Sequence, residues 1–118
     1  MKFTALLKLF RLPNLPTAPG DALAGAAFVF CAACQSSSEH LSSLNDFSVM
    51  LAIIGSAFAA LFLYMYGLAD NDIVGVEEDI SNNSPRPIPQ GELSLGQAKL
   101  ARAICLVLAI IAGVAGSL

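Results

Sequence analysis

Three long apolar segments alternate with two polar stretches along the 118-residue chain. The first apolar segment, residues 18–33, is interrupted by Asp21, whereas residues 47–69 and 103–118 contain no charged side chain. A helix that crosses a bilayer needs about 20 predominantly apolar residues. The pattern therefore predicts an all-α transmembrane helical bundle with three membrane helices, at residues 14–34, 47–69 and 94–118.

The last apolar segment is short for a membrane span. Its uncharged residues, 103–118, would form a helix about 24 Å long. The hydrocarbon core of a bilayer is thicker, at about 30 Å. The segment also ends without a polar cap or a basic anchor. We therefore expect the chain to be a fragment of a larger fold.

The composition and the placement of charge favour a lipid environment. Hydrophobic residues make up 56 % of the chain and charged residues only 13 %, whereas soluble proteins carry about 25 % charged residues. All six Lys and Arg residues lie before the first apolar segment or between the second and the third. By the positive-inside rule, the N-terminus and the loop at residues 70–93 are expected on the cytoplasmic side, and the Ser-rich stretch outside. We expect an integral protein of a bacterial cytoplasmic membrane, with no nucleic-acid partner.

Five of the nine acidic residues follow the second apolar segment, between positions 70 and 79. If the helix continues here at about 3.6 residues per turn, most of the polar side chains share one face. Crowded carboxylates repel one another unless a cation lies among them, and Mg²⁺ binds one or two carboxylates together with phosphate oxygens. The alternative is a solvated acidic loop at the membrane boundary. The residues on the shared face are Asn71, Asp72, Gly75, Glu78, Asp79 and Asn82.

A proline-rich segment follows the acidic stretch and reads Ser84-Pro85-Arg86-Pro87-Ile88-Pro89-Gln90-Gly91. Alternating prolines cannot continue a helix, and they predict an extended, polyproline-like segment. Arg86 lies within this segment, where its guanidinium can pair with phosphate oxygens or with a carboxylate. The alternative is a basic anchor at the membrane surface. Ser94 then predicts an N-cap for the third helix.

These motifs resemble those of the UbiA superfamily of polyprenyl-diphosphate aromatic prenyltransferases. The family's first Asp-rich motif, Asn-Asp-x-x-Asp-x-x-x-Asp, is similar to residues 71–79, and its Arg-Pro-[Ile/Leu]-Pro-x-Gly turn is similar to residues 86–91. The segment Arg11-Leu12-Pro13-Asn14 looks like the Arg-x-x-Asn pattern that precedes the family's first membrane helix. The resemblance covers nearly the whole chain and implies the N-terminal part of a nine-helix fold.

The resemblance implies an enzyme that transfers a prenyl group from a prenyl diphosphate to an acceptor in the membrane, often an aromatic ring. Mg²⁺ held by Asp72 and Asp79 would help to expel the diphosphate, so these aspartates are the implied catalytic residues. Asn14 and Asn71 would orient diphosphate oxygens, and Arg86 would offset their negative charge. The implied partners are a prenyl diphosphate, a small acceptor, membrane lipid, and the missing C-terminal helices or another subunit.

The chain departs from the family pattern in three ways. Gly75 stands where the family has the middle Asp of the motif, and Glu78 on the same predicted face is the candidate replacement as a metal ligand. The chain supplies three membrane helices, and the second Asp-rich motif is absent. We therefore expect no catalysis from these residues alone. The alternatives are a non-catalytic UbiA-like membrane binding or accessory protein and a small three-helix membrane assembly protein.

Other side chains have simpler expected roles. Asp21 either lines a polar interior or lies at the membrane interface. Cys31 and Cys34 are expected to pack as small hydrophobic residues. His40 is expected to be solvated in the Ser-rich stretch. Gly55 belongs to a face of small residues that suits close helix packing.

Overall fold

The computed structural model describes the backbone of residues 3–36 and 46–116, and side chains in these ranges except at residues 12, 28–36 and 46. Every regular element in the described part is a helix, which confirms the predicted all-α fold. The elements are α1 (Phe3–Leu9), a 3₁₀ helix η1 (Leu12–Asn14), α2 (Thr17–Ser36), α3 (Asp46–Val74), α4 (Val76–Ser81) and α5 (Leu95–Gly116).

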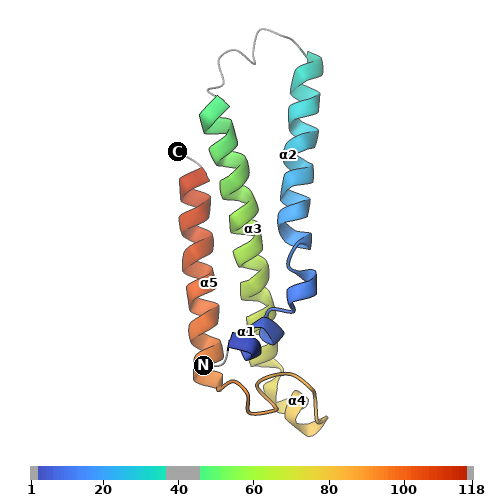
Figure 1. The fold of residues 1–118 in the computed structure, drawn as a ribbon, viewed down its shortest axis with the longest axis vertical. Helices are drawn as coiled ribbons and strands as arrows, with labels where there is room; N and C mark the ends of the chain where they lie inside the picture. Colours follow the sequence, from blue (N-terminus) through green and yellow to red (C-terminus); the bar gives the residue numbers. More distant parts are fainter. Residues whose placement is uncertain (1–2, 37–45, 117–118) are drawn as a thin grey trace.

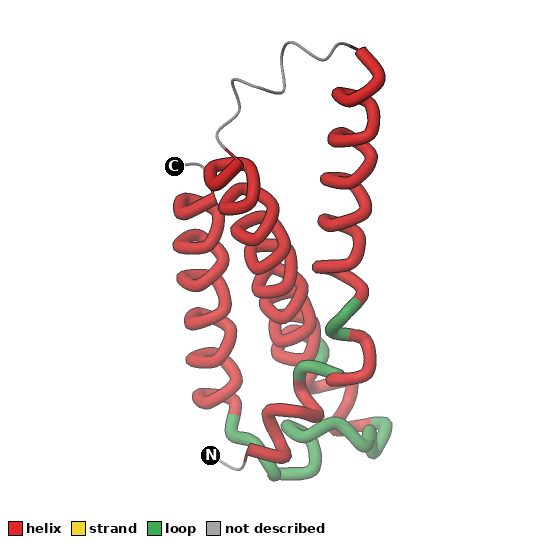
Figure 2. Tube along the Cα trace, turned by 45° about the horizontal axis from the view of Figure 1, so that its top comes forward, coloured by secondary structure: helices red, strands yellow, loops and turns green. Residues whose placement is uncertain are grey.

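The three long helices lie side by side, with α3 between α2 and α5 (Figure 1), and a second view keeps this order (Figure 2). Each runs in the opposite direction to its neighbour. The short helices α1 and α4 gather at the end where α3 finishes and α5 begins. We call this end, made of residues 3–11 and 70–94, the polar end.

Two of the long helices have the length and composition of membrane spans within the described residues, namely α3 over Phe47–Val74 and α5 over Leu95–Gly116. Few of their residues are buried, as expected of helices that face lipid. With 29 residues, α3 extends about 43 Å, longer than a hydrocarbon core of about 30 Å. It continues past the predicted end at residue 69, so its last turn can emerge from the bilayer.

The helices α3 and α5 approach each other closely where two glycines meet. A Cβ atom built on Gly55 would lie 2.5 Å from the Gly116 Cα and 2.8 Å from the Ala112 carbonyl oxygen. Real Cβ atoms do not approach backbone so closely, so only glycine fits at residue 55. This contact confirms that the small-residue face of the second apolar segment packs against another helix.

An apolar core holds the polar end together. Leu9 and Phe10 of the N-terminal segment pack with Leu93 of the loop, and all three are buried. The sequence pattern did not predict the helix α1, which directs Ala5 and Leu9 inward, four residues apart on one face. The core also contains the buried side chains of Ala69, Ala98, Ala101 and Cys105 from the long helices.

Ion pairs link the same segments at the surface. Arg102 on α5 donates to Asp70 on α3 at 2.5 Å, and its guanidinium carbon lies 6.0 Å from the centre of the Tyr66 ring. Lys8 on α1 donates to both carboxylate oxygens of Glu92, at 2.6 and 2.8 Å. These contacts hold α5 and α1 against the end of α3 and the loop that follows it.

The proline-rich segment is a compact turn, so the predicted extended conformation is wrong. The Gln90 N–H donates to the Arg86 carbonyl at 3.2 Å, and the Leu93 N–H donates to the Pro87 carbonyl at 3.1 Å. The φ angle that proline fixes is compatible with turns as well as with polyproline helix. Gly91, with φ +70°, then reverses the chain, which a residue with a side chain rarely does.

Ser94 caps α5 as predicted. The Gln97 N–H donates to Ser94 Oγ, and the Gln97 side chain accepts from the Ser94 N–H, both at 3.2 Å. This reciprocal pair is a capping box, which satisfies two backbone donors at the start of a helix.

Three earlier expectations have different outcomes. The Cys31 and Cys34 side chains and all of His40 lie outside the described residues. Asp21, in the second turn of α2, is exposed and forms no ion pair within the part of the chain that the structure describes. Cys105 is a free, buried cysteine in the apolar core.

Candidate functional site

Asp72 is the centre of the candidate site. It lies in the last turn of α3, and only 3 % of the residue is exposed. Its Oδ1 atom is buried and has no hydrogen-bond partner. Burial of a carboxylate is costly unless positive charge compensates it. The residue therefore indicates a site built around cations.

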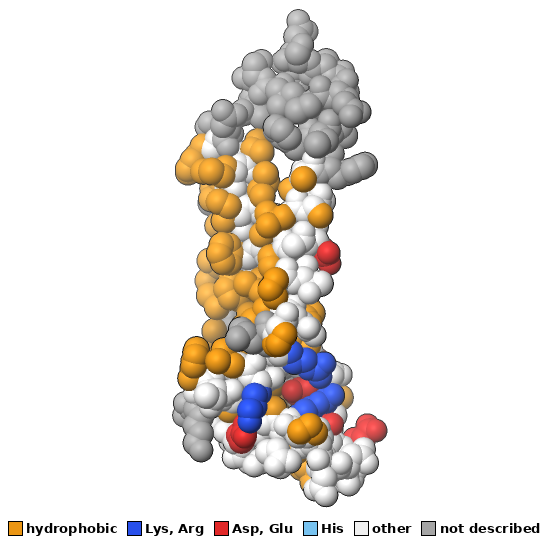
Figure 3. Space-filling view, turned by 45° about the vertical axis from the view of Figure 1, so that its right-hand side comes forward, with side chains coloured by type: hydrophobic (Ala, Val, Ile, Leu, Met, Phe, Trp, Pro, Cys, Tyr) orange, Lys and Arg blue, Asp and Glu red, His pale blue; other side chains and the backbone are white. Residues whose placement is uncertain are grey.

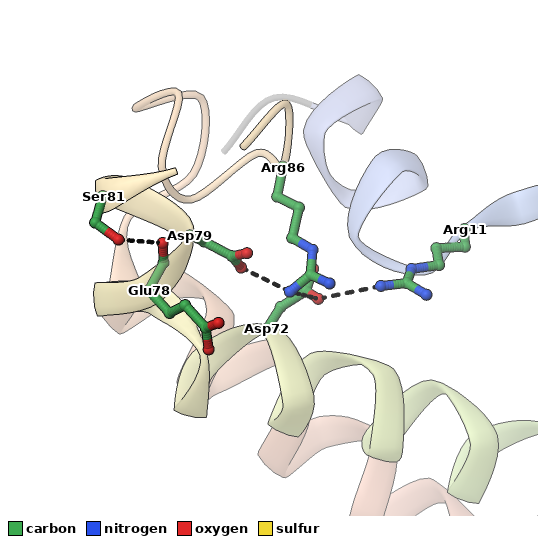
Figure 4. A network of polar contacts seen from close by, with 6 residues as sticks. All are labelled: Arg11, Asp72, Glu78, Asp79, Ser81 and Arg86. Carbon is green, nitrogen blue, oxygen red and sulfur yellow. Dashed lines mark hydrogen bonds and ion pairs between the residues drawn. The ribbon is translucent and has the colours of Figure 1, made fainter. Parts of the chain in front are cut away.

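Arg86 provides the nearest positive charge. Its Nη1 lies 3.4 Å from Asp72 Oδ1 and 2.6 Å from Asp79 Oδ2, so one guanidinium nitrogen serves two carboxylates (Figure 4). Asp79 belongs to α4, whereas Arg86 belongs to the proline-rich turn. The turn folds back over the end of α3 and thereby brings the Arg-Pro motif onto the Asp-rich motif.

Arg11 provides a second guanidinium, and sequence reasoning did not assign it to the site. Its Nη2 lies 3.6 Å from Asp72 Oδ1, on the side opposite Asp79 (Figure 4). Arg11 has φ 45°, an uncommon conformation for a residue with a side chain. The chain turns there, between α1 and η1, and the Asn14 N–H donates to the Arg11 carbonyl at 2.8 Å. The sequence feature that could have identified Arg11 as a site residue is the Arg-x-x-Asn pattern, in which it is the first residue.

Gly75 separates α3 from α4 and lies against the same ion pairs. A Cβ atom at this position would be 3.8 Å from both Arg86 Nη1 and Asp79 Oδ2. Helical hydrogen bonds continue on either side of the break: the Gly75 N–H donates to the Asn71 carbonyl, and the Asp79 N–H donates to the Gly75 carbonyl. A side chain at residue 75 would therefore point into the network, as the predicted helix face requires.

The other predicted site residues lie outside this network. Asn14, Asn71 and Glu78 are exposed, and none has a side-chain hydrogen bond or ion pair within the described ranges. The Glu78 carboxylate points away from the Asp79–Arg86 pair (Figure 4). Their predicted roles in binding metal or diphosphate remain predictions.

The carboxylates of Asp72 and Asp79 provide some of the ligands that Mg²⁺ requires. Asp72 and Asp79 direct one carboxylate oxygen each at the same nitrogen atom, so a single cation between them would contact both. Two carboxylates match the usual number of protein ligands for Mg²⁺ that also binds phosphate. No group of three or more His, Cys, Asp or Glu side chains able to hold a metal occurs among the described residues.

On the face that Figure 3 shows, Lys and Arg side chains gather toward the polar end. The shafts of the long helices above them are mainly hydrophobic and carry an acidic side chain. The described basic residues are Lys8, Arg11, Arg86, Lys99 and Arg102.

The fold and the site define a helical chain of membrane character with an aspartate–arginine cluster at one end. Over 110 residues it is 30 % identical to digeranylgeranylglyceryl phosphate synthase of Methanocaldococcus jannaschii. The match covers 93 % of this chain but 34 % of the synthase, so the chain spans about a third of the length of this relative. No family model matches the chain, and no solved structure does. The similarity supports a distant relationship to UbiA-type prenyltransferases, as the motifs indicate.

Proposed function

We propose that this chain forms the diphosphate-binding end of a UbiA-type prenyltransferase, which transfers a prenyl group from a prenyl diphosphate to an acceptor in the membrane. The observation that carries the proposal is the buried, unpartnered Oδ1 of Asp72, faced by guanidinium groups from two separate segments. The similarity to digeranylgeranylglyceryl phosphate synthase supports the same class of activity.

The two arginines have complementary tasks in this proposal. Arg11 and Arg86 are partly exposed at 41 % and 32 % of the side chain, so each keeps donors free for an incoming anion. A guanidinium group can bind a phosphate through two parallel N–H···O hydrogen bonds, and it remains charged at any physiological pH. A diphosphate head group would therefore lie between Arg11 and Arg86, and its prenyl chain would extend along the apolar faces of α3 and its neighbours.

The two aspartates would make diphosphate binding dependent on a divalent metal. Mg²⁺, bound by Asp72 and Asp79, would bridge to the diphosphate and stabilise it as a leaving group. Asp72 is buried at the end of the apolar helix α3. It would hold the head group at the membrane surface while the prenyl chain stays in lipid. We place this surface on the cytoplasmic side, because the basic residues gather there.

Binding to the chain in lipid nanodiscs tests the proposal directly. Labelled geranylgeranyl diphosphate should bind in the presence of Mg²⁺ and be released by a chelator, whereas geranylgeraniol should not compete. Asp72→Asn should weaken binding by about tenfold or more, because neighbouring metal and phosphate contacts are lost together. Glu77→Gln is the matched control, since Glu77 is exposed in the same acidic stretch and forms no ion pair among the described residues.

The outcomes separate the candidates. Equal binding by the Asp72→Asn and Glu77→Gln variants would contradict the proposed site. Product assays on the intact gene product should include two acceptors, an aromatic compound and geranylgeranylglyceryl phosphate. The second is included because the relative is named for the synthesis of digeranylgeranylglyceryl phosphate.

A non-catalytic diphosphate-binding protein is the second candidate. Gly75 favours it, because a side chain at this position would reach both Asp79 and Arg86, and the chain has none there. Gly75→Asp in the intact gene product distinguishes the two. A large gain in Mg²⁺-dependent prenyl transfer over a near-inactive Gly75 form supports the binding protein, and equal activity of both forms supports the enzyme.

A further inference from the structure

We propose that Arg86 is an internal cation: it occupies the position of a divalent metal between Asp72 and Asp79, and it moves to the phosphate oxygens when metal and diphosphate bind. This inference rests on the proposed function, in that the displacing ligand is a metal–diphosphate complex. It goes further by assigning the same guanidinium two successive partners. It also predicts a competition between arginine and metal that is measurable without diphosphate.

A charged Asp72 carboxylate needs a cation beside it in this buried position. Asp72 is nearly fully buried, and its Oδ1 faces the Nη atoms of Arg86 at 3.4 Å and Arg11 at 3.6 Å without a hydrogen bond to either. Both distances exceed those of a formed hydrogen bond, so this oxygen is held by charge alone. An oxygen so placed remains available to a harder, smaller cation.

Arg86 is held mainly by Asp79. Its Nη1 donates to Asp79 Oδ2 at 2.6 Å, and the same nitrogen lies between the two carboxylates. A metal bound by both aspartates would have to take the place of this nitrogen. The competition is therefore direct rather than transmitted through the fold.

Gly75 leaves the space beside Arg86 and Asp79 free of a further side chain. Its missing side chain would stand 3.8 Å from Arg86 Nη1 and from Asp79 Oδ2. A third carboxylate at that position would add to the negative charge around Arg86 Nη1. With glycine, two carboxylates face one guanidinium at close range, and the second guanidinium, Arg11, balances the remaining charge from the other side of Asp72.

Arg86 has a route out of this position. About a third of its side chain is exposed, and it lies on the turn between α4 and α5 rather than within a helix. The guanidinium can therefore rotate outward while the buried core contact of Leu93 keeps the turn in place. Released from the carboxylates, it can pair with phosphate oxygens bound to the same metal.

Mn²⁺ binding without diphosphate tests the proposal, with the full chain in nanodiscs and free Mn²⁺ measured by its electron paramagnetic resonance signal. Removal of the competing cation by Arg86→Gln should tighten Mn²⁺ binding about tenfold, the scale on which neighbours of metal ligands change affinity. Lys99→Gln is the matched control, because it removes the same charge from an exposed residue of α5. The double variant Arg86→Gln, Asp72→Asn should lose the gain.

Unchanged or weaker Mn²⁺ binding by Arg86→Gln would overturn the proposal, and so would an equal gain in Lys99→Gln. If Arg86→Gln does not fold, Arg86→Met takes its place, because it keeps an apolar stem and removes the charge, and a gain in the same direction is expected. Absence of any gain there overturns the proposal as well. Failure of prenyl diphosphate to bind, together with a gain in Mn²⁺ affinity, would instead contradict the proposed function and leave the cation exchange supported.

Discussion

The two ends of α3 are held by different kinds of contact. In its first half, Gly55 packs directly on the backbone of α5 at Gly116, and the surrounding side chains are apolar. In its last turn, Asp72 is buried among guanidinium groups that come from distant parts of the chain. Close packing of small residues depends on shape and is insensitive to salt and pH, whereas the Asp72 cluster depends on a balance of charge.

This difference indicates which part of the molecule a bound ligand can rearrange. The apolar contacts between α3 and α5 depend on close packing rather than on charge, so a charged ligand does not exchange them. The charged groups at the polar end have several partners within reach, since one Arg86 nitrogen serves both Asp72 and Asp79. A ligand that brings its own charge can rearrange such a cluster without disturbing the helices.

The largest expected effect on stability comes from removing the cation beside the buried carboxylate. Arg86→Gln should lower the free energy of unfolding by about 3 kcal/mol, at the low end for a broken buried pair because Arg11 remains nearby. Adding Asp72→Asn should recover part of this loss, because the uncompensated buried charge is then gone. Detergent unfolding followed by circular dichroism measures both. A double variant no more stable than Arg86→Gln would contradict a charge-dependent polar end.

The next effect tests the other half of the comparison. Gly55→Ala should lower the free energy of unfolding by about 1–3 kcal/mol, the usual cost of overpacking, because the added Cβ meets backbone atoms of α5. Gly67→Ala on the same helix has open space around it and is the matched control. It should be neutral or stabilising by up to about 1 kcal/mol, since alanine favours helix. Equal effects of the two substitutions would mean that α3 and α5 do not pack through Gly55.

The helices α3 and α5 were predictable from the sequence because hydropathy and length define them. The predicted segment 47–69 is extended by five residues in α3, which carry Asp70 and Asp72. Hydropathy places the end of a span where charge begins, but a helix ends only where its hydrogen bonds end, and these continue to Gly75. The small-residue face around Gly55 was also predictable, because glycine and alanine favour close approach.

The polar end was predictable in its composition but not in its pairing. The sequence motifs predicted Asp72, Asp79 and Arg86 as site residues, and the structure brings these three side chains close together. Arg11 was missed because its pairing depends on α1 folding back on the loop, through burial of Leu9 against Leu93, which no local pattern encodes. Long-range contacts of this kind depend on tertiary packing rather than on local sequence preferences.

A smaller effect tests the start of α5, where the two regions join. Ser94→Ala should lower the free energy of unfolding by about 1 kcal/mol, because the hydroxyl that accepts from the Gln97 N–H is lost. Ser56→Ala is the control: its hydroxyl only donates to the Ile53 carbonyl within α3 and caps nothing. Hydrogen exchange at the first turn of α5 should rise in the Ser94 variant alone. Equal protection in both variants would show that the cap does not hold this turn.

The smallest expected effect distinguishes the surface of the polar end from its buried cluster. Lys8 donates to both Glu92 oxygens, but the two side chains are 55 % and 35 % exposed. Exposed ion pairs contribute about 0.2–1 kcal/mol and weaken with salt. A double-mutant cycle with Lys8→Met and Glu92→Gln should therefore give a coupling energy below about 1 kcal/mol that nearly vanishes in about 1 M salt. The Arg86–Asp72 coupling should persist under the same conditions, because Asp72 is shielded from solvent. If both couplings fell equally with salt, Asp72 would be accessible to ions, and the contrast between the charged surface and the buried carboxylate would be lost.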